Sequence, residues 1–309
     1  MPEEVSDTRQ INSGSSQSQR RTTGDFLDDK LTNLDNHIPE RRLHRLFFSN
    51  GFKWPLTQKQ SRVFTAFFFS LIFWWFSTAV IMYLSFIPNT RTLSFLFSLG
   101  LALVSLYLLY HFRNDRSERA IYISFTAGVL IWAFVEVSFY SGYIVGPRVR
   151  PIFSIKPSMD SFFRAVHQSA YHEGLVLFLA CLIFGISAKA KNKFGLYVYL
   201  MFWFMHQSAK LNIFLGVMNT GKELVPETVE SMTHYMTIAH MNWLFPFSIT
   251  LTTLIAAYVW NKVKQSDEAW IQVGFSLIGT MSILALLEHW LLVVPLDQSI
   301  WEIVVKRLH

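Results

Sequence analysis

Charged residues and cysteine are both scarce in this chain. Asp, Glu, Lys and Arg together make up 16% of the 309 residues, against about 25% in an average soluble domain. The single cysteine, Cys181, excludes a disulfide within the chain and lies in an apolar run. The fourteen glycines form no loop of the kind that cradles phosphates. The composition therefore argues against a charged soluble domain, a disulfide scaffold and a phosphate-binding loop.

Apolar residues dominate instead. They make up 51% of the chain, with 29 Phe and 10 Trp, and the mean hydropathy is +0.30. Several apolar runs approach 20 residues, the length that crosses a bilayer as a helix. A net charge of +6 does not indicate nucleic acid here, because Lys and Arg gather in the cytoplasmic loops of membrane proteins. The sequence predicts an all-α polytopic membrane protein whose first partner is the lipid bilayer.

The N-terminal region differs in composition from the rest. Residues 1–36 are polar, have almost no aromatic side chains and lack the apolar core of a signal peptide, so we expect a disordered tail. Residues 37–62 mix Arg and Lys with Leu, Phe and Trp, which is typical of an amphipathic segment on an anionic cytoplasmic surface. A docking tail for a partner protein is the alternative. Residues 63–302 form the predicted transmembrane domain.

Seven membrane helices are predicted within that domain. They cover residues 63–87, 93–112, 120–145, 163–188, 194–217, 243–263 and 269–295. The N-terminal segment and the loops at 111–119 and 189–193 are basic, whereas the loop at 219–242 is acidic, which places the N-terminus in the cytoplasm and the C-terminus outside. The loop at 147–162, also basic, opposes this orientation.

Polar side chains interrupt four of the predicted helices at a similar depth, in the outer leaflet. These residues are Glu136, His167, His172, Glu173, His206, Gln207, Lys210, Asn212, Glu288 and His289. Burying such groups in hydrocarbon costs several kcal/mol unless they find partners. We therefore expect them to form one cluster, in which Lys210 pairs with Glu136 or Glu288.

Three interpretations of the cluster remain open on the residues alone. It is a network of ion pairs that fixes helix register, a site for iron, manganese or zinc, or a site where a histidine ligates the central metal of a tetrapyrrole pigment. The spacing suits a metal poorly, because the neighbours His172 and Glu173, like Glu288 and His289, point about 100° apart on a helix. The Glu-x-x-His pairs of di-iron bundles are also missing.

Several strings in the sequence resemble the PuhE family, photosynthetic complex assembly proteins of purple and related bacteria. They include EVSFYSGY at 136–143, QSAKLN at 207–212 and LEHW at 287–290. Further matches lie at 119–132, 146–148, 214–217, 219, 241–242, 244–246 and 295–296. The resemblance covers roughly residues 62–302, in the family's order. Two features depart from it: the N-terminal extension, and His206, where the family has Arg.

The resemblance implies a membrane-embedded assembly factor for the photosynthetic reaction centre and core antenna, which handles bacteriochlorophyll or another pigment. It implies the bacterial inner or intracytoplasmic photosynthetic membrane, and reaction-centre or antenna subunits as partners. The competing expectation is a membrane metal-dependent enzyme of pigment biosynthesis, so catalysis is left open. The candidate site residues are Glu136, His172, Glu173, Gln207, Lys210, Asn212, Glu288 and His289, in preference to His206.

Overall fold

The computed structural model describes residues 57–147 and 156–295, and this part of the chain is helical, without strands. The predicted tail at 1–36 and most of the amphipathic segment at 37–62 lie outside the described residues. Residues 58–62 belong to the first long helix, α3 (Gln58–Phe86), which begins before the predicted boundary. Thr57 caps this helix by accepting a hydrogen bond from the backbone of Gln60. The prediction of an all-α fold is confirmed.

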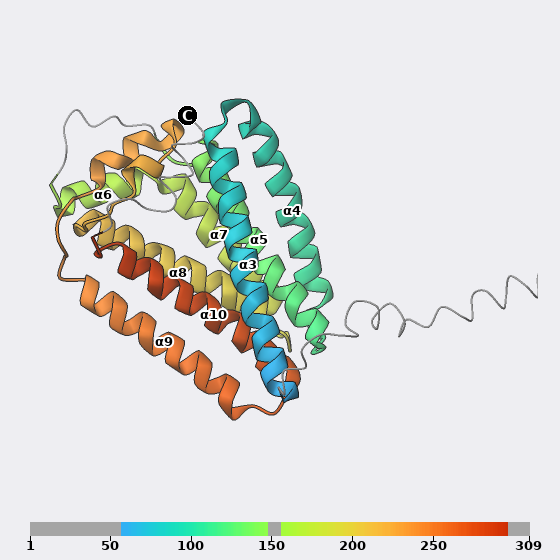
Figure 1. The fold of residues 1–309 in the computed structure, drawn as a ribbon. Helices are drawn as coiled ribbons and strands as arrows, with labels where there is room; N and C mark the ends of the chain where they lie inside the picture. Colours follow the sequence, from blue (N-terminus) through green and yellow to red (C-terminus); the bar gives the residue numbers. More distant parts are fainter. Residues whose placement is uncertain (1–56, 148–155, 296–309) are drawn as a thin grey trace, which may run out of the picture. The chain divides into compact units, whose positions relative to one another are not determined.

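Seven long helices and four shorter ones make up the described fold (Figure 1). After α3 the long helices are α4 (Arg91–His111), α5 (Glu118–Tyr140), α7 (Ala170–Ser187), α8 (Phe194–Leu215), α9 (Phe245–Gln265) and α10 (Ala269–Leu291). A ten-residue helix, α6 (Met159–Gln168), precedes α7. The 3-10 helices η1 (Pro88–Thr90), η2 (Lys222–Leu224) and η3 (Glu227–Tyr235) lie in the connections.

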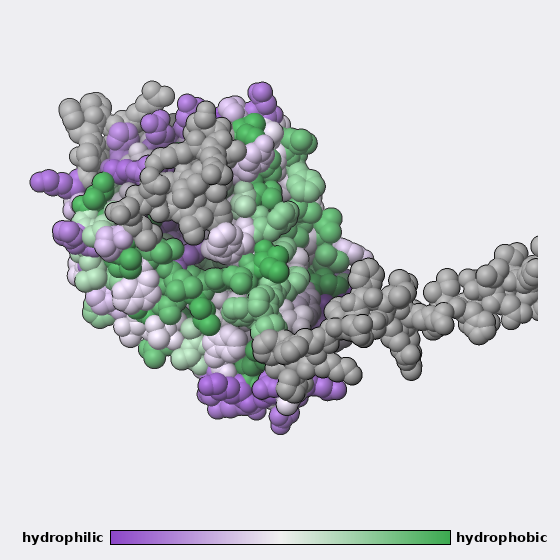
Figure 2. Space-filling view, viewed as in Figure 1, coloured by the Kyte–Doolittle hydropathy of each residue, from purple (hydrophilic) through white to green (hydrophobic). Residues whose placement is uncertain are grey.

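The helices are those of a multi-pass membrane protein. Five of them, α3, α4, α5, α7 and α10, are long and apolar enough to cross a bilayer. Figure 2 shows apolar side chains across the middle of one face and hydrophilic ones gathered at its two ends. Helices α8 and α9 also coincide with predicted membrane helices, but they carry more polar side chains, among them Lys210 and Lys262. The expectation of a polytopic helical bundle is confirmed.

One predicted membrane helix is wrong in its extent. The segment 163–188 is not continuous, because α6 ends at Gln168 and α7 begins at Ala170, with Ser169 between them outside helical geometry (φ −104°, ψ 14°). The backbone N–H of His172 donates to the carbonyl oxygen of Val145, so the first turn of α7 is tied to the segment that follows α5. The apolar pattern runs through Phe163 and Val166, which is why the sequence suggested a single helix.

Helix α5 lies deepest in the bundle and helix α3 lies at its edge. In their most apolar windows 67% of the residues of α5 are buried, against 6% for α3. The backbones of α5 and α8 meet at Gly128 and Gly195. A Cβ atom at Gly128 would lie 2.5 Å from the carbonyl oxygen of Gly195, so only glycine allows this approach. The close contact holds α5 and α8, which carry Glu136 and His206, side by side.

Candidate functional site

A pocket of about 340 Å³ lies between α3, α5, α8 and α10. Its walls are largely aromatic and apolar, with Trp74, Trp132, Tyr140 and Phe202 among the lining residues. Its carboxyl and imidazole groups are those of Glu136, His206, Glu288 and His289, and Ser77, Thr78 and Tyr140 contribute hydroxyl groups. The volume falls at the lower end of the range of about 300–1,000 Å³ that is usual for small-molecule sites. An apolar chamber with a few convergent polar groups is the ordinary form of a ligand site.

Glu136 and His206 form the centre of the pocket's polar side. His206 Nδ1 lies 3.3 Å from Glu136 Oε1, and both side chains are mostly buried. The other ring nitrogen, Nε2, is buried and has no hydrogen-bond partner among the described residues. A carboxylate beside Nδ1 favours the proton on that nitrogen, so the buried Nε2 keeps its lone pair.

Aromatic rings hold the His206 imidazole from two directions. The Trp132 ring meets it nearly edge-on at 5.4 Å between centroids, and Trp132 itself stacks on Phe202 at 6.1 Å. The His172 ring lies 5.7 Å from that of His206 and 4.7 Å from that of Phe139. His172 is fully buried, and neither of its ring nitrogens has a hydrogen-bond partner within the described ranges. His206 is therefore oriented by its neighbours.

His289 has no free ring nitrogen. Its Nδ1 lies 2.9 Å from the carbonyl oxygen of Ala285, which can only accept, so Nδ1 is the donor. Its Nε2 lies 2.9 Å from the hydroxyl of Ser208 and accepts from it. With only 3% of its surface exposed, His289 bridges α10 and α8. Its neighbour Glu288 lines the pocket and keeps an exposed side chain.

The prediction that Lys210 pairs with Glu136 or Glu288 is wrong. Lys210 Nζ lies 2.5 Å from Glu173 Oε1 on α7, and not beside Glu136 or Glu288. Gln207 donates to the second oxygen of the same carboxylate, at 2.6 Å. Glu173 thus has a partner for each oxygen, and the three residues join α7 to α8. None of these three residues lines the pocket. They therefore stabilise the packing of α7 against α8 outside the pocket.

Asn212 and His167 lie apart from the polar cluster in which the sequence placed them. The amide of Asn212 donates to Ser208 O and to Ser248 Oγ, and its side-chain oxygen accepts from Asn242. This buried network fastens the end of α8 to α9 and the preceding loop. His167 is exposed on α6, outside the pocket.

The described residues do not form a metal centre from protein ligands alone. Within 57–147 and 156–295 no three His, Cys, Asp or Glu side chains are placed to hold one ion. A catalytic zinc or non-haem iron site needs about three such ligands. A metal already held within an organic ring would need fewer protein ligands, and a histidine such as His206 is a residue type that would hold it.

Sequence reasoning did not single out the aromatic residues that line the pocket, among them Trp74 and Trp132. Trp132 precedes Glu136 by four residues, so the two share a face of α5. That spacing could have indicated that the Trp132 indole lies beside the Glu136 carboxylate. Trp74 on α3 had no such indication, because its membrane helix carries no charged residue near it.

Comparison with known proteins gives a family and one relative of this chain. A family model described as "Protein of unknown function (DUF3623)" matches residues 60–308. A protein of Rhodobacter capsulatus, described as an uncharacterized 30.4 kDa protein in the puhA 5′ region, is 30% identical over 240 residues. That alignment covers 75% of this chain and 87% of the relative. No solved structure matches the chain.

Proposed function

This chain belongs to the DUF3623 family, and we propose that it is a membrane-embedded assembly factor for the photosynthetic reaction centre and core antenna. Two observations support this role. The relative from Rhodobacter capsulatus is named for its position beside puhA, and the strings at 136–143, 207–212 and 287–290 resemble the PuhE family of assembly proteins. The proposed location is the inner or intracytoplasmic photosynthetic membrane of a bacterium.

We propose further that the pocket holds a pigment of the bacteriochlorophyll type during assembly. The observation that carries this step is His206, whose Nδ1 faces Glu136 and whose Nε2 is without a partner in the described structure. Indole and phenyl walls suit the flat faces of a conjugated ring. When bound, such a pigment would supply a central magnesium or iron, and His206 would hold it through a ring nitrogen. The pocket, of about 340 Å³, admits part of such a ring system.

The residue at position 206 distinguishes two proposed roles of the site, ligation of a pigment and a contact with Glu136. The PuhE family has Arg where this chain has His206, and an Arg would keep the charged contact with Glu136 while offering no lone pair. Ligation through His206 is therefore proposed for this chain, and the contact between residues 136 and 206 for the assembly role in general. The enzyme alternative has less support, because the described residues bring no three metal ligands together.

Deletion of the gene tests the assembly role. We expect lower reaction-centre and core-antenna absorbance in membranes, while pigment precursors continue to form. Complementation with His206→Arg should restore absorbance if the contact with Glu136 is what assembly requires, whereas His206→Ala should restore less. Accumulation of one discrete pigment intermediate would favour the enzyme instead. Unchanged absorbance under phototrophic growth would contradict both.

A further inference from the structure

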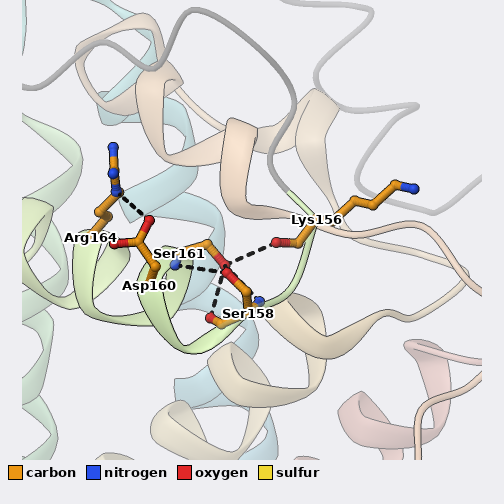
Figure 3. Close-up of polar contacts among 5 residues, drawn as sticks. All are labelled: Lys156, Ser158, Asp160, Ser161 and Arg164. Atoms are coloured by element: carbon orange, nitrogen blue, oxygen red, sulfur yellow. Dashed lines mark hydrogen bonds and ion pairs between the residues drawn. The ribbon is translucent and has the colours of Figure 1, made fainter.

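Helix α6 presents three different faces, and one of them is covered by the protein. Ser161 and Gln168 are buried. The side-chain amide of Gln168 donates to the hydroxyl of Ser231 in η3, at 2.5 Å. Ser158 caps the helix start through a reciprocal pair of hydrogen bonds with Ser161 (Figure 3). This face fixes α6 against the loop region at one end of the bundle.

The second face is charged. Arg164 Nε lies 2.8 Å from Asp160 Oδ2, one turn away, and both side chains are largely exposed. Figure 3 shows this pair, with Lys156 extending away from it. Burial raises the pKa of Tyr235, the last residue of η3, while Arg164 lowers it and Asp160 raises it. At about 100° per residue, Arg164 is offset by about 40° from Gln168, which contacts η3, so the charged face borders the covered face.

The third face of α6 is apolar and exposed. Met159, Phe163 and Val166 are 70%, 62% and 41% exposed, and their spacing of four and three residues places them on one stripe. At about 100° per residue this stripe lies opposite Gln168, on the side turned away from η3. Apolar side chains thus face away from the polar loop, which is the reverse of what a helix surrounded by water would show.

We propose that α6 lies in the membrane–water interface, with Met159, Phe163 and Val166 among the lipid acyl chains. Two features of the structure support lipid as the occupant. Only Ser169 separates α6 from α7, a helix that is long and apolar enough to cross the bilayer, so α6 lies at that helix's membrane boundary. Tyr171, in the first turn of α7, continues the exposed aromatic surface at 61%.

The same geometry places the charged face at the level of the lipid headgroups. Asp160 and Arg164 stand between the apolar stripe and η3, so they meet the polar zone when the stripe is in lipid. The break at Ser169 then has a role, since it lets the chain turn from the interface into the membrane. Helix α6 anchors the boundary of α7, which carries Glu173 and His172.

Single-cysteine spin labelling in vesicles tests this placement. The native Cys181 is exposed on α7 and serves as a lipid-facing reference. In a Cys181→Ser background, a label is placed at Phe163→Cys, with His167→Cys as the matched control from the exposed polar side. Collisions with oxygen, which concentrates in lipid, are compared with collisions with a water-soluble nickel chelate. The vesicles contain phosphatidylethanolamine and phosphatidylglycerol.

We expect the Phe163→Cys label to resemble Cys181, with oxygen collisions dominant, and the His167→Cys label to collide mainly with nickel. Met159→Cys provides the same measurement if Phe163→Cys accumulates poorly. A nickel-accessible label at position 163 would place the stripe in water and overturn the proposal. Protection from both reagents would show that a protein covers the stripe, which also overturns it.

Discussion

Lys210 on α8 donates to Glu173 on α7, with 2.5 Å between Nζ and Oε1. Both side chains are 28% exposed, and the Lys210 ammonium also lies 5.9 Å above the Phe139 ring. The pair joins two helices at the level of His172, behind the pocket that His206 lines. Because both charges lie within helices of the membrane bundle, each depends on the other for compensation.

Removal of one member of this pair should destabilise the protein. Breaking a fully buried ion pair costs about 3–5 kcal/mol, because the other charge is left without a partner; with both side chains 28% exposed, this pair should cost less than that and more than a surface pair. Lys210→Met should therefore lower the amount of protein in membranes sharply, and Lys210→Met combined with Glu173→Gln should recover much of it. Immunoblots of membrane fractions measure this effect.

The exposed pair on α6 is the control for that experiment. Asp160 and Arg164 make a contact of 2.8 Å with 76% and 61% of their side chains exposed, and surface pairs contribute about 0–1 kcal/mol. Arg164→Gln should leave abundance nearly unchanged. Equal losses from Lys210→Met and Arg164→Gln would contradict the structural role of the Lys210–Glu173 pair.

The contact between Gly128 and Gly195 gives a second prediction. A methyl group at Gly128 would lie 2.5 Å from both the Gly195 carbonyl oxygen and Val198 Cγ1. Gly128→Ala should push α5 from α8 and cost about 1–3 kcal/mol, as overpacking usually does. Thermal denaturation in detergent should show a lower midpoint.

Gly185→Ala is its matched control on α7, since no atom lies within 4 Å of a Cβ there. This change should be neutral or stabilising by up to about 1 kcal/mol, because alanine is the better helix former. A Gly128→Ala protein as stable as Gly185→Ala would contradict the close approach of α5 and α8.

The orientation in the membrane gives a third prediction. Four polar contacts join the helix ends and loops at one end of the bundle. Arg62 contacts Glu118 at 2.8 Å, and Lys59 donates to the carbonyl oxygens of Lys264 and Ser266. The backbone N–H of Asn192 donates to the carbonyl oxygen of Arg113. This end is rich in Lys and Arg, which remain in the cytoplasm. A reporter active only in the cytoplasm should work after Lys191, and one active only outside should work after His309. A periplasmic reporter active after Lys191 would invert the orientation.

The sequence predicted the helices well, and the partners within the site less well. Apolar runs define helix positions because bilayer thickness fixes their length, and the depth of Glu136, His206 and Glu288 followed from those positions. Depth alone does not say which side of a helix a residue occupies relative to its neighbours. Hence Glu173, at a depth similar to Glu136, became the partner of Lys210, a choice that depends on helix rotation and packing.

The break at Ser169 was beyond sequence reasoning for a different reason. Phe163 and Val166 extend the apolar pattern of α7 toward its N-terminus, and no Pro or Gly lies between them and Ala170 to mark a boundary. The helix ends there through tertiary contacts, with Gln168 bound to Ser231 and the His172 N–H bound to Val145. Such contacts have no local signature.

The absorbance spectrum of gently solubilised, purified protein tests the central claim most directly. Protein isolated from a pigment-producing host should carry a tetrapyrrole absorbance band that is lost in both His206→Ala and His206→Arg, because neither offers a ring nitrogen as ligand. His167→Ala, an exposed histidine outside the pocket, should retain the band. A wild-type protein without the band, or a His206→Ala protein that keeps it at full strength, would contradict a pigment held by His206 in this pocket.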